Sequence, residues 1–294
     1  METSMCIIVA KQFDDSWNIV KNRCRNYLAD VTFKRVKRGD LEILYFLDSI
    51  TQYMEGFNSA GISILSASLQ VLDDEKEIET RSKTPSKDGA KIAKALTYPD
   101  LKAAAMSLIK SKLTGHTFIT DGETLYLLEG AWKKGGYKKQ EYEYRIRKAK
   151  DGEIIVRTNH GVDLEWAGYQ RGVDKNQDMS RISSECRKLI AEKVAKDANT
   201  VMEILDGLTV NHTNNPQLNP TRTTTDAKKM RTTSQTLIVP KDNTMIVRPI
   251  QSKVTIDFNK LHNIDAKTFV EILSNRIPYG NLKNIEGKPS FKNL

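Results

Sequence analysis

A cysteine close to the start of the chain offers the most distinctive chemistry in this sequence. Cys6 follows Met5 and opens the apolar, β-branched run Cys6–Ala10. A thiol that shares its residue with an unblocked α-amino group carries its own general base, because that amine titrates at about pH 8 and can accept the thiol proton. This requires Cys6 to become the first residue, through initiation at Met5 and removal of that methionine, or through autoproteolytic loss of residues 1–5. The competing interpretation is core packing, because cysteine is one of the most buried residue types.

The residue patterns of several other catalytic classes do not occur in the sequence. It contains no His-x-x-x-His pair, no Walker loop, no GxGxxG and no GxSxG. The cysteines include no CxxC pair, which argues against a disulfide framework and against a cysteine zinc site. We therefore expect no metal and no cofactor. The histidines and cysteines considered are His116, His160, His212, His262, Cys6, Cys24 and Cys186.

Strand patterns surround Cys6 and continue along the chain. Residues 6–10 and 17–23 are predicted to form two strands joined by a short polar turn. Asp-Gly dipeptides between alternating segments predict two further hairpins, at residues 121–122 and 151–152. Additional strands are predicted at residues 41–48, 61–71, 235–239 and 245–248.

Helical periodicity appears in two separate blocks. Residues 92–96 and 101–113 each place their apolar residues on one face, which predicts two helices in tandem. A longer helix is predicted to begin at Ser183 or Ser184, and a Thr-x-x-Glu capping box at residues 200–203 predicts a short successor. The buried side of the longer helix is expected to carry Cys186, Leu189, Ile190 and Val194. Antiparallel strands interrupted by two helical blocks, without βαβ units, favour an α+β fold with two sheets, each covered by helices, over a Rossmann fold.

Length and charge limit the function classes. The 294 residues are expected to form a single domain, 1–294, with a long polar loop at residues 211–226. No stretch approaches the about 18 consecutive apolar residues of a membrane span, and the start lacks a secretory signal pattern, so we expect a cytoplasmic protein without a membrane partner. A formal charge of +9 suggests nucleic acid, but the basic residues are spread over several predicted hairpins and loops, so a solvated basic surface is preferred. The basic clusters are residues 34–38, 133–139, 145–150 and 228–231.

Several short segments occur in the order seen in a known group of enzymes. Besides Cys6, they are Asn22-Arg23, residues 53–64 (YMEGFNSAGISI), residues 157–161 (RTNHG) and residues 183–187 (SSECR). Together they resemble the N-terminal-nucleophile (Ntn) hydrolases of the choloylglycine hydrolase and penicillin V acylase group, and more closely the acyl-coenzyme A:6-aminopenicillanate acyltransferase-like branch. The resemblance implies the four-layer αββα Ntn fold. It also implies an amidohydrolase or acyltransferase that cleaves a linear carbon–nitrogen bond in a small-molecule or peptide amide.

The resemblance also implies roles for individual residues. Cys6 would be the nucleophile that forms a thioester, with its own amine acting first as base and then as acid. Arg23 would help to hold the nucleophile and its amine. Asn58 would contribute its backbone N–H to the oxyanion hole, and Asn159 its side-chain amide. Arg231, in the segment RTTSQ, would be the counterpart of a late arginine near the active site.

One position departs from the pattern of that group. Where the group has an aspartate shortly after the arginine, this chain has Cys24. A thiol supplies negative charge only when it is ionised, which we expect Arg23 and Arg25 to favour, unless Asp14 or Asp30 takes the place of the aspartate. The departure keeps two other function classes open: a catalytically impaired Ntn-fold protein with a binding or structural role, and a basic nucleic-acid-associated protein. A homo-oligomer is also left open.

Overall fold

The computed structural model describes residues 6–25, 27, 29–48, 51–69, 88–133, 141–168, 174, 176–222, 224, 230–250, 252–256 and 269–272. The predicted leader, residues 1–5, lies outside this part of the chain, as do His262 and the side chain of Asp30. The predicted strand at 61–71 and the predicted loop at 211–226 are described only in part.

The first sheet is built around the two strands at the start of the chain. β1 (Ile7–Phe13) and β2 (Ser16–Arg25) form the predicted antiparallel hairpin, and Asp14 and Asp15 turn the chain with φ of +50° and +58°. Aspartate tolerates this left-handed conformation better than most residues, which explains the polar turn. The sheet has six strands in the order β10-β1-β2-β11-β12-β14, and only its β12–β14 pair is parallel among the described pairs. Its other strands are β10 (Ile155–Arg157), β11 (Arg231–Val239), β12 (Thr244–Pro249) and β14 (Phe269–Ile272).

The second sheet has eight strands in the order β13-β3-β4-β5-β6-β7-β8-β9. It is antiparallel except for the described β13–β3 pair. The hairpin predicted at Asp121-Gly122 joins β7 to β8, and Gly122 has φ of +97°. The strands are β3 (Ala29–Arg38), β4 (Leu41–Asp48), β5 (Met54–Asn58), β6 (Ser63–Ala67), β7 (Gly115–Thr120), β8 (Leu125–Lys133), β9 (Glu141–Lys148) and β13 (Ser252–Ile256).

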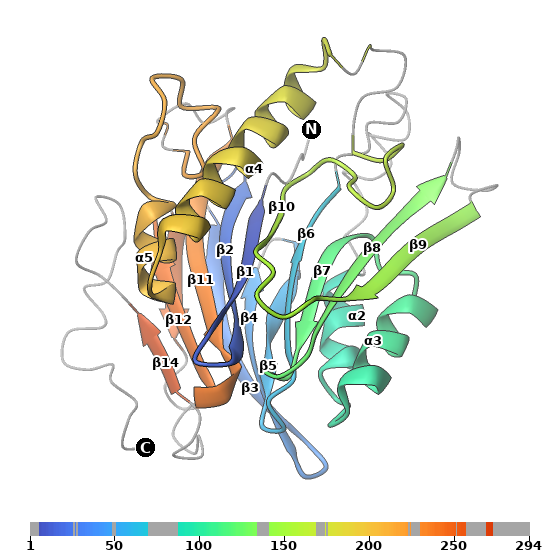
Figure 1. Ribbon diagram of the computed structural model, residues 1–294. Coiled ribbons are helices and arrows are strands. Elements are labelled where there is room, and N and C mark those ends of the chain that lie inside the picture. Colours follow the sequence, from blue (N-terminus) through green and yellow to red (C-terminus); the bar gives the residue numbers. More distant parts are fainter. Residues whose placement is uncertain are drawn as a thin grey trace.

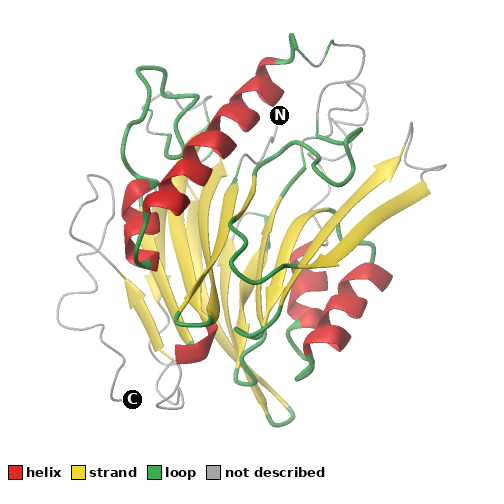
Figure 2. Ribbon diagram, in the orientation of Figure 1, coloured by secondary structure: helices red, strands yellow, loops and turns green. Residues whose placement is uncertain are grey.

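Helices cover the outer side of each sheet, as Figures 1 and 2 show. α2 (Asp88–Ala95) and α3 (Leu101–Lys110) pack on the eight-stranded sheet, with Ile92 and Leu108 among the buried contacts. α4 (Met179–Asp197) and α5 (Val201–Gly207) pack on the six-stranded sheet through residues such as Ala191 and Leu205. A 3₁₀ turn, η1 (Pro240–Asp242), links β11 to β12. The predicted α+β, four-layer αββα sandwich is therefore confirmed.

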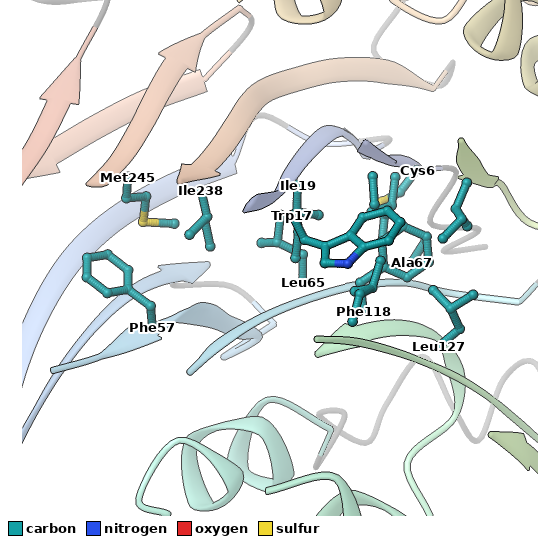
Figure 3. Packing of buried hydrophobic residues seen from close by; sticks show 14 of the residues in the cluster. Cys6, Trp17, Ile19, Phe57, Leu65, Ala67, Phe118, Leu127, Ile238 and Met245 are labelled. Atoms are coloured by element: carbon teal, nitrogen blue, oxygen red, sulfur yellow. The ribbon is translucent and has the colours of Figure 1, made fainter. Parts of the chain in front are cut away.

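The main apolar core lies between the two sheets. Trp17 and Ile19 from the six-stranded sheet meet Phe46, Leu65 and Phe118 from the eight-stranded sheet. In Figure 3, Cys6 lies at the end of this cluster far from Met245 and Phe57. Charged side chains of β2 enter the inter-sheet layer as well, and they form the site described below.

One of the two predicted hairpins with an Asp-Gly turn does not form. Asp151-Gly152 does not close a hairpin, because β9 belongs to the eight-stranded sheet and β10 pairs with β1 in the other sheet. The Asp-Gly turn instead carries the chain from one sheet to the other. Strands β3, β5, β13 and β14 were not predicted.

The prediction for α4 is wrong in both its start and its buried face. The helix begins at Met179, and the Asp178 carboxylate caps it by accepting from the backbone N–H groups of Ser180 and Arg181. Leu189, predicted to be buried, is 65% exposed. The buried residues of the helix are Ser183, Ser184, Arg187, Ala191 and Ala195.

In the described part of the chain, none of the helices combines the length and the apolar character needed to cross a membrane.

Candidate active site around Cys6

Strand alternation decides which side of the six-stranded sheet Cys6 faces. Ile7 and Val9 of β1 pack against the helical layer, whereas Ile8 and Ala10 lie between the sheets. Cys6 directly precedes β1 and continues the second series, and its side chain is 1% exposed. We call the side toward the other sheet the inner face and the side covered by α4 and α5 the outer face. The Cys6 thiol is thus buried on the inner face.

Arg25, at the end of β2, contacts the Cys6 thiol. Its Nη1 lies 3.7 Å from Cys6 Sγ, and its Nε donates to the Tyr27 hydroxyl at 3.1 Å and lies 3.5 Å from Asp48 Oδ2. Burial by itself lowers the pKa of Arg25, but attraction to Cys6, Tyr27 and Asp48 more than offsets burial and leaves that pKa raised. Arg25 is therefore a permanent cation in position to stabilise a thiolate on Cys6.

Two buried carboxylates from the other sheet hold the cations of β2. Arg23 donates from Nη2 to Asp48 and from Nη1 to Glu55, each at 3.1 Å. Lys21 pairs with Glu55 as well. Burial raises the pKa of Asp48, but Arg23 and Arg25 act in the opposite direction and lower it to about 2. Asp48 is therefore ionised at neutral pH and orients both arginines.

The charges of this network are complementary to a thiolate. Among the described residues, the β2 cations of the inner face outnumber the carboxylates that bind them by one. Burial lowers the pKa of Lys21, while attraction to Glu55 and Cys6 raises it in part. A thiolate on Cys6 adds a negative charge beside these cations. The members are Lys21, Arg23, Arg25, Asp48 and Glu55.

Arg23 and Arg231, both predicted site residues, lie on the same inner face. Arg23 is fully buried, with its guanidinium over the Phe46 ring at 5.0 Å. It belongs to the network through its bond to Asp48. Arg231 is 6% exposed and stands opposite Arg25 in the β11–β2 register. The structure thus brings both predicted arginines to this end of β2, but the contact to Cys6 Sγ comes from Arg25.

Asn159 lies just beyond the strand that pairs with β1. Ile8 pairs with Arg157, the last residue of β10, so Asn159 follows this pair by two residues as Cys6 precedes it by two. Its backbone N–H donates to Ser184 Oγ at 2.8 Å, and its Nδ2 donates to the Ser68 carbonyl at 2.7 Å. Its Oδ1 accepts from Arg187 Nη2 at 3.1 Å. These bonds fix which end of the amide points in which direction.

Arg187 anchors this amide from the outer face. It is fully buried on α4, and its Nε donates to the Ser183 carbonyl at 3.2 Å. Among the described residues, Nη1 of this arginine has no hydrogen-bond partner. Burial and the like charge of Arg222 lower the pKa of Arg187 to about 9, against a smaller opposing attraction to Cys24 and Cys6. A buried arginine bonded to neutral acceptors is costly, which is the usual mark of a functional position.

Cys24 does not take the role expected for it. It lies on the outer face, one residue out of phase with Arg23 and Arg25, and its Sγ is 3.2 Å from Thr232 Oγ1. Burial raises the pKa of this thiol, although Arg222 lowers it in part. The expectation that Arg23 and Arg25 ionise Cys24 is therefore wrong, because adjacent strand residues point to opposite faces. The carboxylates that bind the cations near the Cys6 thiol are Asp48 and Glu55 instead.

Asn58 lies away from the thiol network. It is opposite Ile43 in the β4–β5 register, whereas Asp48 ends β4. Its backbone N–H donates to the Ile62 carbonyl at 3.0 Å, and its Nδ2 donates to the carbonyls of Leu96 and Tyr98. The N–H predicted to serve an oxyanion hole is thus already used in a turn. Through its side chain Asn58 ties the β5–β6 turn to the residues that follow α2.

Sequence reasoning missed Arg25, Asp48, Glu55 and Arg187. A signal for the first was present: Lys21, Arg23 and Arg25 occupy alternate positions of a strand that is otherwise apolar or neutral, which indicates cations on one buried face. The carboxylates gave no signal, because each follows or interrupts an ordinary strand pattern. Arg187 was hidden by the choice of the wrong helix face.

Comparisons with known proteins identify no family. No family model matches the chain, and no curated protein matches it. Among solved structures, the chain is similar to penicillin V acylase from Agrobacterium tumefaciens, with 10% identity over 84% of this chain and 86% of that chain and a TM-score of 0.40. A similarity of this size carries no functional information, so the chemistry of the site has to decide. No group of three or more His, Cys, Asp or Glu residues in the described part of the chain could hold a metal ion.

Proposed function

We propose that the chain is an amidohydrolase or acyltransferase that cleaves a linear carbon–nitrogen bond through a thioester on Cys6. The observation that carries the proposal is the contact of Cys6 Sγ with Arg25, whose guanidinium is held by Asp48. The proposal requires loss of residues 1–5, so that Cys6 gains an unblocked α-amine. The substrate is then a small-molecule or peptide amide.

The first half-reaction consumes the amide. The α-amine of Cys6 takes the thiol proton, and the thiolate attacks the carbonyl carbon while the C=O π electrons move to oxygen. Collapse of this intermediate breaks the C–N bond, and the leaving nitrogen takes the proton from the Cys6 ammonium. The acyl group remains on sulfur as a thioester. Arg25 stabilises the thiolate before attack, and Asp48 positions Arg25.

The second half-reaction restores the thiol. Water attacks the thioester in a hydrolase, or a second amine attacks it in an acyltransferase, and the Cys6 amine accepts the proton that the nucleophile loses. The Cys6 thiolate leaves and is reprotonated. In both half-reactions the Asn159 amide supplies hydrogen bonding to the oxyanion, supported by its place just after the strand that pairs with β1 and by the bonds that orient it.

The test combines intact mass with thiol labelling. We expect the mass of the purified protein to correspond to a chain that begins at Cys6. Iodoacetamide should label one fast-reacting thiol, and this label should disappear in Cys6→Ala while persisting in Cys24→Ala and Cys186→Ala. Turnover of N-acyl amides by a chain that retains Met1 would contradict the amine-as-base mechanism, and fast labelling that survives Cys6→Ala would contradict the nucleophile.

A non-catalytic descendant of the fold is the second candidate. It is favoured by the burial of Cys6, which packs in the inter-sheet cluster at 1% exposure as a core residue would. In that case residues 1–5 stay attached, iodoacetamide reacts slowly with Cys6, and Cys6→Ala loses stability by about 1 kcal/mol while labelling elsewhere is unchanged. The same two measurements therefore separate the candidates.

A further inference from the structure

Among the described strands, β9 ends the eight-stranded sheet and leaves one edge open. Its one strand neighbour in the described part of the chain is β8, and Figure 1 shows β9 on the outside of the sheet. The register with β8 is continuous from Glu141 to Lys148, with no bulge and no proline. Tyr144 and Ile146 are 40% and 38% exposed. An edge of this kind is a template for a further strand unless its side chains prevent pairing.

The direction of the backbone groups at this edge follows from one hydrogen bond. The Ala149 N–H donates to the Leu125 carbonyl at 2.8 Å. These two residues are opposite each other when the β8–β9 register is continued by one pair. In an antiparallel ladder, hydrogen-bonded and non-hydrogen-bonded pairs alternate, so the odd-numbered residues of β9 bond to β8. The N–H and C=O groups of Tyr142, Tyr144 and Ile146 therefore point away from the sheet.

The side chains of β9 are complementary to a second copy of the same strand. When Tyr144 lies on a two-fold axis, Glu143 faces the partner's Arg145, and Glu141 faces the partner's Arg147. In this register Tyr142 and Ile146 face each other across the interface. The residues with outward backbone groups then form the hydrogen-bonded pairs.

The neighbouring symmetric registers are disfavoured by charge. Moving the two-fold axis to Glu143 places that glutamate opposite its own copy, and moving it to Arg145 does the same for that arginine. Like charges directly opposite destabilise an antiparallel pair. Within one chain Arg145 pairs with Glu143 at 2.9 Å and donates to the Tyr144 carbonyl at 3.1 Å, and Arg147 pairs with Glu153. Association therefore exchanges these contacts for contacts across the two-fold axis. Only the axis at Tyr144 satisfies the backbone and the charges together.

We propose that two copies of this chain associate through antiparallel pairing of their β9 strands about a two-fold axis at Tyr144. The interface joins the two eight-stranded sheets edge to edge, far along the chain from Cys6. It follows from the β9 sequence and register alone, and it is independent of the proposed function.

The test uses charge exchange at the central pair. Analytical ultracentrifugation at about 1–100 µM should show a monomer–dimer equilibrium for the natural sequence. Glu143→Arg and Arg145→Glu should each weaken the dimer by about 10-fold or more, because like charges then face each other twice. An equimolar mixture of the two variants should form a heterodimer, and the double variant E143R/R145E should dimerise again. Glu192→Arg, at an exposed ion pair on α4, is the matched control that leaves association unchanged.

Circular dichroism and thermal unfolding establish that each variant is folded. A natural chain that stays monomeric at 100 µM overturns the proposal. So does a dimer whose dissociation constant is unaffected by either charge reversal, because that dimer uses another surface. Loss of association in both single variants without recovery in the mixture also contradicts the register centred on Tyr144.

Discussion

The two faces of β2 bury positive charge in opposite ways. On the inner face, Arg23 and Arg25 are bound by the carboxylate of Asp48. On the outer face, Arg187 reaches toward the same end of the strand, and its hydrogen bonds go to the neutral oxygens of Ser183 and Asn159. A buried charge that has an opposite charge beside it depends on that partner, whereas a buried charge without one lowers the stability of the fold. The inner face therefore holds its arginines through carboxylates, whereas the outer face holds Arg187 through neutral acceptors.

Removing the inner carboxylate should have the largest effect on stability. Asp48→Asn leaves two buried guanidinium groups without their common counter-charge, so we expect the free energy of unfolding to fall by about 3–5 kcal/mol. Urea denaturation measures this loss. Asp163→Asn is the control, because its pair with Arg157 is partly exposed and should cost less than about 1 kcal/mol. Equal losses in the two variants would remove the distinction between the compensated face and the surface.

The pH dependence of stability should report the same carboxylate. The pKa of Asp48 is about 2 in the folded chain, below its ordinary value of 3.8, because Arg23 and Arg25 stabilise the ionised form against burial. A lowered folded pKa stabilises the fold above the unfolded pKa, and about 2 kcal/mol of this is lost as pH falls from 5 toward 2. Asp48→Asn should lose this part of the slope.

Glu129 provides the internal comparison for that titration. Burial raises its pKa, but His116 and the backbone N–H groups of Asp163 and Leu164 lower it to about 2. Asp48→Asn should therefore retain the acid sensitivity that comes from Glu129. A pH profile of unfolding that is identical in Asp48→Asn and the natural chain would contradict the ionised state of Asp48.

Arg25 should act on the reactivity of the thiol more than on its position. Arg25→Gln removes the cation beside Cys6 Sγ, and we expect iodoacetamide alkylation of Cys6 at pH 7 to slow by about 10-fold. Arg25→Lys should recover much of this rate, because the positive charge is kept. Stopped-time labelling with mass detection measures both. Equal rates in all three proteins would mean that Asp48 and Arg25 hold the fold without influencing the thiol.

Removing the outer arginine should have the smallest effect on stability. Arg187→Met exchanges a buried charge for a buried thioether, so the loss of hydrogen bonds and the relief of desolvation should cancel to within about 1 kcal/mol. We expect kcat for amide cleavage to fall by about 10-fold with KM nearly unchanged, because the Asn159 amide loses its orientation.

A double variant tests the link from Arg187 to Asn159. In Asn159→Ala, the further change Arg187→Met should have almost no additional effect on kcat, since its target is gone. Additive losses would show that Arg187 acts by another route. A fall in stability of about 3 kcal/mol in Arg187→Met alone would show that the outer face is as compensated as the inner one.

Much of the layered architecture follows from local sequence. The alternation in residues 6–10 and 17–23 predicts β1 and β2, the periodicity of residues 92–113 predicts α2 and α3, and the Asp-Gly turn at 121–122 predicts the β7–β8 hairpin. Each of these signals involves residues within one turn or one hairpin of each other. The same local information misread Asp151-Gly152, because the sequence of a turn does not show which sheet receives the next strand.

What the sequence determined by itself is a thiol at the head of a strand and two helical layers. What tertiary structure decided is which groups meet that thiol. β10 pairs with β1 across about 150 residues of chain, and β4 brings Asp48 from the other sheet to Arg25. Asn58 lies in a more suggestive sequence motif, but its side chain donates to the carbonyl of Leu96, just after α2. The periodicity of a segment indicates which of its faces is buried, whereas the pairing of distant strands depends on the packing of the whole chain.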